Sequence, residues 1–402
     1  MPASYRLFRL PRLLLSRLLT SSVSPNPSPS PNPNPTYPKT LKATINALFK
    51  ESDPDKLAAG FISASSSPRF RCRHRIYEVS VRRLAGAGRR DAVEAVLESQ
   101  KLFPSDLSHE GFAVRIISLY GKVGMPSHAA ATFDQLPALG CPRTVKSLNA
   151  LLTAYADACD FDSLSVAFEE IPRKDPSIVP DVYSYNILIR ALCEKSDLDA
   201  ALDVLTLMEK CEIEPNLISF NTLLNGFYKN QRFSEAEKIW SLMRENNVAP
   251  DVKSFNAKLR GLVIDGKATE AVELVQKMKE DGLKPDTSSF NTLIRGHITD
   301  GNLEEAKRVY LDLVMNDCAP NKGTYEALVP SLCDSGDLDL AVRCCFDSMS
   351  RRCFMDAAVL QALVDALVKA SREEDATKLV ELGRKNKYSR KSLRMPEKCS
   401  AT

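Results

Sequence analysis

Five asparagines recur at an interval of about 35 residues, and their side chains have the chemistry needed to read nucleotide bases. Each carboxamide offers two hydrogen-bond donors and one acceptor atom, which is enough to contact one base edge. A fixed period of such groups can match successive nucleotides of a single strand, with one base for each repeat. The five positions are Asn149, Asn186, Asn221, Asn256 and Asn291.

A second feature has the same period, because a proline followed by an acid or an amide closes each unit. The closing pairs are Pro180-Asp181, Pro215-Asn216, Pro250-Asp251, Pro285-Asp286 and Pro320-Asn321. Repeats of roughly 20–50 residues are typical of a solenoid, in which each unit packs only on its neighbours. The asparagines and the closing residues therefore belong to one repeated surface.

The unit from Val182 to Asn216 predicts a helical hairpin. Apolar residues at helical spacing indicate a first helix that ends near Glu194, and Asp197 is predicted to cap a second helix. Pro215 stops the chain before the next unit begins. The pattern predicts an all-α fold, an α-solenoid of about 8–10 helix-turn-helix hairpins. Small residues recur at the helix contacts and turns, namely Ala201, Ala236, Ala271, Ala306, Ala341, Gly266, Gly301 and Gly336.

The clarity of the repeats divides the chain into segments. Six clear units occupy residues 145–356, and residues 74–144 are predicted to form two divergent units. Residues 39–73 are predicted to form a degenerate N-terminal hairpin, and residues 357–386 a closing hairpin. A basic, disordered tail is predicted for residues 387–402. The repeats thus account for nearly all of the chain after its first residues.

Residues 1–38 have the composition of an organelle transit peptide followed by a proline-rich spacer. They contain four arginines and no acid, and serine, proline and asparagine dominate their second half. Arginine-rich, serine-containing and acid-free sequences are typical of such targeting segments. We expect import into mitochondria, with chloroplasts as the alternative, and a merely disordered basic terminus remains a second interpretation.

The charge of the chain changes when this leader is set aside. The whole sequence has 54 Lys and Arg against 51 Asp and Glu, and residues 1–38 contribute four of the basic residues and none of the acids. The remainder therefore carries 50 basic and 51 acidic residues. Nucleic acid would have to bind through a locally basic groove or through base contacts, because bulk attraction to phosphate is absent.

Other residues that could do chemistry have spacings that favour structural roles. Eleven cysteines include no Cys-x-x-Cys pair, and the four histidines form no metal or nucleophile motif. Trp240, the only tryptophan, falls where neighbouring units carry other bulky apolar residues, which indicates core packing rather than a platform for a base. The apolar run Leu13–Leu19 is too short to span a membrane. We expect no enzyme, metal, cofactor, small-molecule substrate or membrane association.

The repeats resemble the P-type arrays of the pentatricopeptide-repeat family of plant organelles. The stretches Tyr185–Lys195 and Phe220–Gly226 are similar to the family pattern V-x-T-Y-N-T-L-I-x-G-L-C-K-x-G. The resemblance implies a right-handed superhelix and single-stranded RNA as partner. It also implies that the fifth and the last residue of each unit together choose one base.

Carried onto this sequence, that rule pairs each asparagine with a closing residue. The pairs are Asn149 with Asp181, Asn186 with Asn216, Asn221 with Asp251, Asn256 with Asp286, and Asn291 with Asn321. In the family, Asn with Asp favours uracil, and Asn with Asn favours cytosine or uracil. The resemblance therefore implies a preference for U-Y-U-U-Y, where Y is a pyrimidine. The flanking units break the pattern, since the next one carries Glu326 and Asp356.

Basic residues near the repeats are the expected contacts to the RNA backbone. They are Lys146, Lys229 and Lys253 within the units, and Arg384, Lys385, Lys387, Arg390 and Lys391 near the C-terminus. The terminal cluster is alternatively a solvated end. The family tends to place a lysine at the thirteenth position of each unit and an apolar clamp at the second, and this chain mostly departs from both. Weak phosphate contact predicts weak binding by the array alone.

At a finer level the chain resembles the small plant pentatricopeptide proteins that associate with mitochondrial ribosomes. The segment Arg143–Leu152 and the basic tail carry this resemblance. It implies a role in mitochondrial RNA metabolism or translation, with ribosomal RNA and mitochondrial ribosomal proteins as partners. One alternative is a free adaptor that binds a pyrimidine-rich transcript site for stabilisation, processing or translation, and another is a protein scaffold.

Overall fold

A computed structural model describes residues 40–386 and 393–395, and within these residues the regular elements are helices without a strand. The chain forms two compact units, Met1–Ser80 and Val81–Thr402, and helix α5 (His74–Gly86) runs through the boundary between them. The prediction of an all-α fold is confirmed. The repeats lie in the second unit.

The first unit contains short helices around an aromatic core. They are α2 (Leu41–Lys50), α3 (Pro54–Ala64), α4 (Pro68–Arg71) and the beginning of α5. The Phe61 ring packs edge-on against Phe70 and Tyr77, with centroid distances of 5.1 and 4.9 Å. All three rings are buried, so they hold α3, α4 and α5 together.

The second unit is a series of helices, most of them 10–14 residues long, with shorter helices among them. Its first part contains α6 (Arg90–Gln100), α7 (Pro104–Leu107), α8 (Glu110–Lys122), α9 (Pro126–Gln135) and the short 3₁₀ helix η1 (Pro137–Leu139). The hairpins that follow are α10 (Val145–Asp157) with α11 (Phe161–Lys174), α12 (Val182–Lys195) with α13 (Leu198–Lys210), α14 (Leu217–Lys229) with α15 (Phe233–Glu245), α16 (Val252–Ile264) with α17 (Ala268–Glu280), α18 (Thr287–Thr299) with α19 (Leu303–Met315), α20 (Lys322–Ser335) with α21 (Leu338–Ser350), and α22 (Ala357–Lys369) with α23 (Glu373–Asn386).

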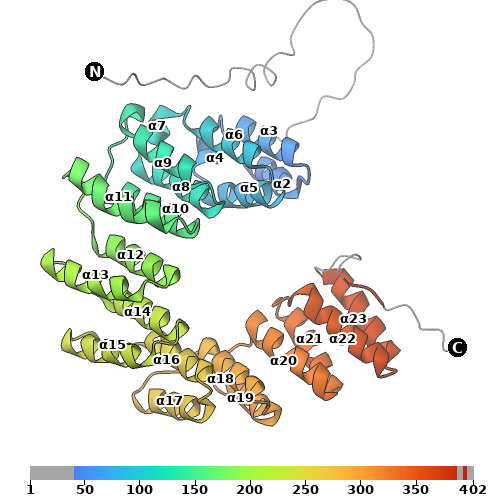
Figure 1. The fold of residues 1–402 in the computed structure, drawn as a ribbon. Helices are drawn as coiled ribbons and strands as arrows, with labels where there is room; N and C mark the ends of the chain where they lie inside the picture. Colours follow the sequence, from blue (N-terminus) through green and yellow to red (C-terminus); the bar gives the residue numbers. More distant parts are fainter. Residues whose placement is uncertain (1–39, 387–392, 396–402) are drawn as a thin grey trace, which may run out of the picture. The chain divides into compact units, whose positions relative to one another are not determined.

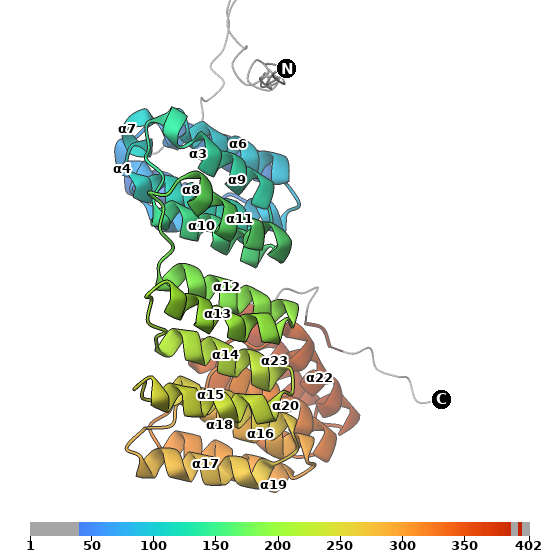
Figure 2. The same cartoon turned by 60° about the vertical axis from the view of Figure 1, so that its left-hand side comes forward.

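The hairpins stack in the manner of a solenoid. Each first helix from α10 to α22 contacts the second helix of its own hairpin, and from α10 to α20 it also contacts the first helix of the next hairpin. Figure 1 labels these helices along the chain. Helices α12 to α17 can be followed as successive pairs in Figure 2. A continuous row of first helices therefore runs through the array, and the predicted α-solenoid is confirmed.

Small residues set the spacing of this row. The glycine at the tenth position of three first helices lies directly against the preceding first helix. A Cβ atom at Gly226 would meet the Cys193 side chain, and one at Gly261 would meet the Tyr228 ring. At Gly296 it would come within 2.9 Å of Val263 Cγ2. The backbones of neighbouring first helices thus approach more closely than side chains with a Cβ would allow.

The predicted positions of the recurrent alanines and turn glycines are confirmed. The five alanines at the helix contact are fully buried, and the glycines at three turns have positive φ angles of 71°, 74° and 80° at Gly266, Gly301 and Gly336. The predicted cap at Asp197 is wrong in one respect. Asp197 precedes α13 at its N-cap position, yet its side chain accepts no hydrogen bond from the first turn.

Candidate nucleic-acid interface

The closing residue of each unit caps the first helix of the next unit. At Asp181, Oδ1 accepts from the backbone N–H of Ser184 at 2.9 Å, and the Asp181 N–H donates to Ser184 Oγ at 3.0 Å. This reciprocal arrangement is a capping box, which satisfies donors that the helix start would leave unpaired. The same box occurs at Asn216, Asp251, Asp286 and Asn321. The residues predicted to read bases therefore also have a local structural role.

Each predicted pair of asparagine and closing residue is joined by a hydrogen bond. The Nδ2 group of the asparagine donates to Oδ1 of the closing residue in every case. The distances are 3.0 Å for Asn149 to Asp181, 3.3 Å for Asn186 to Asn216, 3.1 Å for Asn221 to Asp251, 3.0 Å for Asn256 to Asp286, and 3.1 Å for Asn291 to Asn321. The structure thus places together the residues that the sequence paired.

A buried hydroxyl group holds the other end of each asparagine amide. It comes from the third residue of the following unit and donates to the asparagine Oδ1. The donors are Ser184 to Asn149, Ser219 to Asn186, Ser254 to Asn221 and Ser289 to Asn256, each at 2.6 Å, and Thr324 to Asn291 at 2.7 Å. Asparagine, closing residue and hydroxyl form one triad per junction, and we call the five triads the amide ladder.

The amide ladder changes what the asparagines can offer to a base. Their exposed fractions are only 4–9%, and one N–H and one lone pair of each amide are already bonded within the chain. Because an asparagine amide has two N–H donors, one donor remains for an external partner. The residue type alone predicts two available donors. The closing residues are more accessible, with Asp181 and Asp286 exposed.

The three aspartates of the ladder are held in their charged form. Burial alone would raise the pKa of the Asp251 carboxyl, but hydrogen bonds from the Ser254 backbone, the Asn221 amide and the Ser254 hydroxyl outweigh it and hold the pKa below its ordinary value. The same balance lowers the pKa of Asp181 and Asp286. A carboxylate accepts hydrogen bonds without donating any, so it fixes the direction of the asparagine N–H that it receives.

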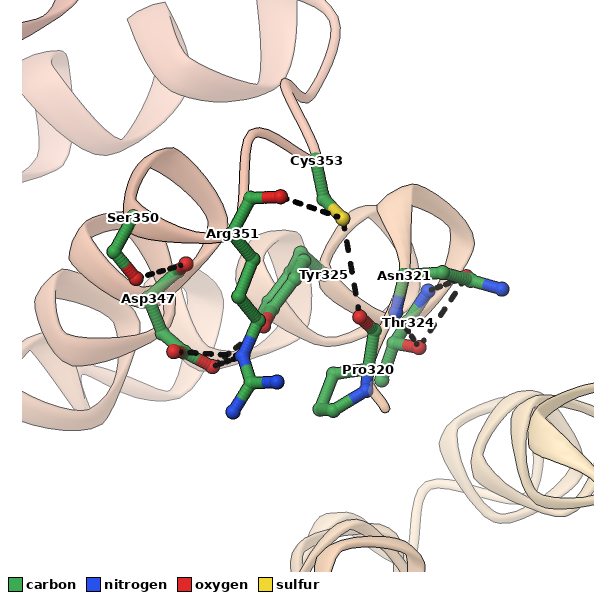
Figure 3. Close-up of polar contacts among 8 residues, drawn as sticks. All are labelled: Pro320, Asn321, Thr324, Tyr325, Asp347, Ser350, Arg351 and Cys353. Carbon is green, nitrogen blue, oxygen red and sulfur yellow. Dashed lines mark hydrogen bonds and ion pairs between the residues drawn. The ribbon is translucent and has the colours of Figure 1, made fainter. Parts of the chain in front are cut away.

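The ladder ends at the unit that starts with Lys322. The Thr324 hydroxyl still donates to Asn291 Oδ1. Asn321 caps α20 by accepting from the Thr324 backbone N–H through Oδ1, and its Nδ2 points away from Thr324 (Figure 3). At the fifth position of this unit stands Glu326, and its Oε1 accepts from the Asp356 backbone N–H at 2.7 Å. Lys322 Nζ lies 2.6 Å from Asp356 Oδ1. A pair of carboxylates bridged by one lysine replaces the amide here.

A polar cluster beside the end of the ladder fixes α20 against α21. The Tyr325 hydroxyl donates to Asp347 Oδ2 at 2.6 Å, and Arg351 Nε donates to the same carboxylate at 2.8 and 2.9 Å (Figure 3). Burial and the Asp347 charge raise the pKa of Tyr325, so this hydroxyl stays protonated. The cluster therefore packs α20 and α21 together.

The predicted backbone contacts within the units are accessible. Lys146, Lys229 and Lys253 are exposed, and none of the three side chains forms an ion pair with a residue that the structure describes. Arg384 and Lys385 are exposed near the end of α23, where Arg384 Nη2 donates to the Leu393 carbonyl at 3.3 Å. Lys387, Arg390 and Lys391 lie outside the described residues.

Second-position residues project into solvent beside the ladder. Tyr183 is 54% exposed and Ile218 is 59% exposed, although both side chains are large and mainly apolar. Trp240, by contrast, is buried as the sequence predicts, and its Nε1 donates to the Tyr228 hydroxyl at 3.0 Å. Exposed side chains that could stack on a base thus occur at the second positions of two units.

The third-position hydroxyls are functional groups that were not predicted from the sequence. Their signal was present, since a serine or threonine recurs with the same period at positions 147, 184, 219, 254, 289 and 324. An N-terminal Asp or Asn followed three residues later by a serine also marks a helix start. The pattern was thus sufficient to find the caps, although not the bonds between units.

Two general features limit the chemistry of this surface. In the part of the chain that the structure describes, no group of three or more His, Cys, Asp and Glu residues is arranged to hold a metal ion. Over the same residues, no helix has the length and apolar character needed to cross a bilayer.

Comparison with known proteins identifies the repeats. Residues 180–229, 215–264, 250–297 and 285–334 match the model of the PPR repeat family. The chain is 45% identical over 171 residues to the small ribosomal subunit protein mS78 of Arabidopsis thaliana. The matched residues make up 42% of this chain and 42% of mS78. It is 43% identical over 159 residues to the small ribosomal subunit protein mS79 of the same plant, covering 40% of each. The chain thus spans about two fifths of the length of the curated relatives it matches.

One solved structure has a similarity to this chain that extends over most of its length. The crystal structure of the pentatricopeptide repeat protein PPR10 from maize covers 86% of this chain and 59% of its own, with 17% identity and a TM-score of 0.45. The assignment itself depends on the family model and on the helical hairpins in register with it. Residues 180–334 are therefore similar to the pentatricopeptide-repeat family, in agreement with the resemblance seen in the sequence.

Proposed function

We propose that this protein binds single-stranded RNA along the amide ladder and acts, without catalysis, as a component or associate of the mitochondrial ribosome. The observation that supports the RNA contact is the ladder itself. Five asparagines repeat in one register, each with one amide N–H not used by its closing residue. Such an array offers one donor for each nucleotide of a strand.

The ribosomal setting is supported by the relatives and by the weakness of the surface. Two proteins similar to this chain are named as small ribosomal subunit proteins. Scattered basic residues such as Lys229 and Lys253 accompany the ladder, and Glu326 with Asp356 closes one end with negative charge. Few phosphate contacts give low affinity in isolation. A site of this kind suits RNA that is already held by other proteins.

A mitochondrial location is part of the proposal. Residues 1–38 carry four arginines and no acid, as transit peptides do. Another similar protein, 42% identical over 164 residues, is named as a mitochondrial pentatricopeptide repeat-containing protein. Chloroplast import is the alternative. Within the chain, we assign RNA contact to residues 145–356 and additional backbone contact to the basic residues near the C-terminus.

Sedimentation of a tagged protein tests the ribosomal assignment. A lysate of isolated mitochondria is separated on a sucrose gradient with magnesium and again after its removal, which dissociates ribosomal particles. We expect the protein to sediment with one ribosomal subunit and to follow that subunit in both gradients. Recovery only at the top of the gradient would overturn the ribosomal assignment while leaving RNA binding open to a direct test.

A free transcript adaptor is a second candidate, favoured by the unbroken register of five ladder units. It would bind a U-Y-U-U-Y oligonucleotide tightly without ribosomal partners. Replacing Asn221 and Asn256 by threonine would then redirect binding toward purines at the third and fourth nucleotides. Weak binding of the isolated protein together with ribosomal sedimentation would exclude this candidate.

A further inference from the structure

The third-position hydroxyls are buried, repeated and committed to a contact between units. Ser184, Ser219, Ser254, Ser289 and Thr324 have no solvent exposure. Each donates to the asparagine of the preceding unit rather than to a group of its own helix alone. A capping box requires the hydroxyl only within its own helix start. The bond between units is therefore an additional property of these residues.

The direction of each bond follows from counting hydrogens. The Ser254 hydroxyl has a single hydrogen, and two acceptors lie near it, Asn221 Oδ1 at 2.6 Å and Asp251 Oδ1 at 3.1 Å. The shorter contact takes the hydrogen, because two oxygens at 2.6 Å without one would repel. Ser254 Oγ meanwhile accepts from the Asp251 N–H at 3.1 Å. The hydroxyl therefore orients Asn221 Oδ1 toward itself.

We propose that these hydroxyls are positioning residues for base selection. By holding Oδ1, each one leaves the same amide N–H available in all five units, so the ladder prefers bases that carry a carbonyl acceptor over adenine, which presents ring nitrogens and an amino group instead. This inference depends on the proposed RNA binding and deepens it. The hydroxyl need not touch RNA, since it acts through the asparagine of the preceding unit.

The closing residue determines how much each amide depends on its hydroxyl. Asp251 is a carboxylate, and its charge-assisted bond helps to hold the Asn221 N–H even without Ser254. Asn321 is a neutral amide and holds the Asn291 N–H more weakly at a similar distance of 3.1 Å. Loss of the hydroxyl should therefore release the asparagine amide more readily in the Asn291–Asn321 unit than in the Asn221–Asp251 unit.

An isosteric substitution at Thr324 gives the clearest test. Thr324→Val removes the hydroxyl and keeps the branched shape, whereas Thr324→Ser keeps the hydroxyl. Binding is measured by fluorescence anisotropy with U-C-U-U-C oligonucleotides that carry cytosine or adenine at the fifth nucleotide. We expect T324V to lose about fivefold to tenfold of the discrimination against adenine at that nucleotide, about the effect of one hydrogen bond. T324S should retain it.

A second substitution provides a comparison with a charged closing residue. Ser254→Ala should reduce the discrimination at the third nucleotide, and by less than T324V does at the fifth. Ser165→Ala serves as a control, because Ser165 Oγ donates to the Phe161 carbonyl at 3.1 Å on α11, away from the ladder. It should leave discrimination at every nucleotide unchanged. Thermal unfolding verifies that each variant is folded.

The outcomes separate this inference from the proposed function. If the unaltered protein binds none of the oligonucleotides, the proposed RNA contact and the inference both fail. If it discriminates against adenine and T324V discriminates equally well, only the inference fails. A uniform loss of affinity with discrimination intact would assign the hydroxyls a structural role alone and would also overturn the inference. If T324V does not fold, S254A decides by the same criteria at the third nucleotide.

Discussion

Ser254 Oγ donates to Asn221 Oδ1 at 2.6 Å and joins two successive units of the array. The contact is fully internal, since Ser254 has no exposed surface and Asn221 is 8% exposed. A residue whose type suits base reading is thus also part of the bonding between units. Stability and recognition share the same side chains along the amide ladder.

The shared role predicts that a ladder asparagine is needed for stability without any RNA. Asn256→Ala would remove the nearer of the two acceptors of the buried Ser289 hydroxyl and one donor to Asp286. We expect a loss of about 1–3 kcal/mol in the free energy of unfolding, measured by urea denaturation. Asn246→Ala is the control, because Asn246 is exposed at the end of α15 and bonds only the Leu242 carbonyl through its side chain. Equal stability of the two variants would contradict the structural role.

The close approach of first helices predicts a cost for adding a methyl group at Gly261. Its Cβ would meet the Tyr228 ring, which hydrogen bonds to Glu237 and Trp240 hold in place. Overpacking costs about 1–3 kcal/mol, more than the gain of about 1 kcal/mol in helix propensity. Thermal unfolding should therefore show a lower melting temperature for Gly261→Ala. Gly111→Ala is the matched control, since nothing lies near that position in α8, and it should be neutral or stabilising.

The hydrogen bond from Trp240 to Tyr228 predicts that the Tyr228 hydroxyl contributes to the free energy of unfolding. Tyr228→Phe would leave the buried Trp240 N–H without its acceptor at 3.0 Å. The expected destabilisation is about 1–3 kcal/mol by chemical denaturation. Tyr183→Phe removes a hydroxyl from a side chain that is 54% exposed and should change stability little. If both substitutions had the same small effect, the buried bond would not contribute as proposed.

The lowered pKa values of the ladder aspartates predict an acid limit to stability. A carboxyl with a lower pKa in the folded than in the unfolded state stabilises the fold above its unfolded pKa, near 3.9. That contribution disappears as the pH falls through the lower, folded pKa. Asp251→Asn should flatten the acid limb of a plot of melting temperature against pH. Asn216 performs the same capping role naturally, so the variant should remain folded at neutral pH.

The sequence predicted most of the array because its signals are local. Each of these signals predicts structure close to it in the chain. They are the helix periodicity, the prolines that close each unit, and small residues such as Ala236 and Gly266. The bond from Ser254 to Asn221 was missed because it depends on the separation of two first helices. That separation is set by residues elsewhere, including Gly226 against Cys193 and Gly261 against Tyr228. The residual donor on each asparagine could be counted only when both of its internal partners were known.

Asp197 illustrates a different limit of the sequence. Its type and position suit a helix cap, and it does precede α13, yet its side chain accepts nothing from the first turn. Asp337 occupies the corresponding place before α21 and accepts from the Leu340 N–H at 3.3 Å. The same residue type at the same position of two units thus differs in side-chain direction. A pattern of residue types does not predict that direction.

The most direct test of the account is ultraviolet crosslinking of the tagged protein to RNA in intact mitochondria, followed by sequencing of the RNA and mapping of the crosslinked peptides. The account predicts a pyrimidine-rich stretch of ribosomal RNA. It predicts adducts on peptides from α10, α12, α14, α16 and α18, including those that carry the exposed Tyr183 and Ile218. Recovery of no RNA, or adducts confined to the second helices of the hairpins, would contradict the assignment of the amide ladder as the RNA-binding surface.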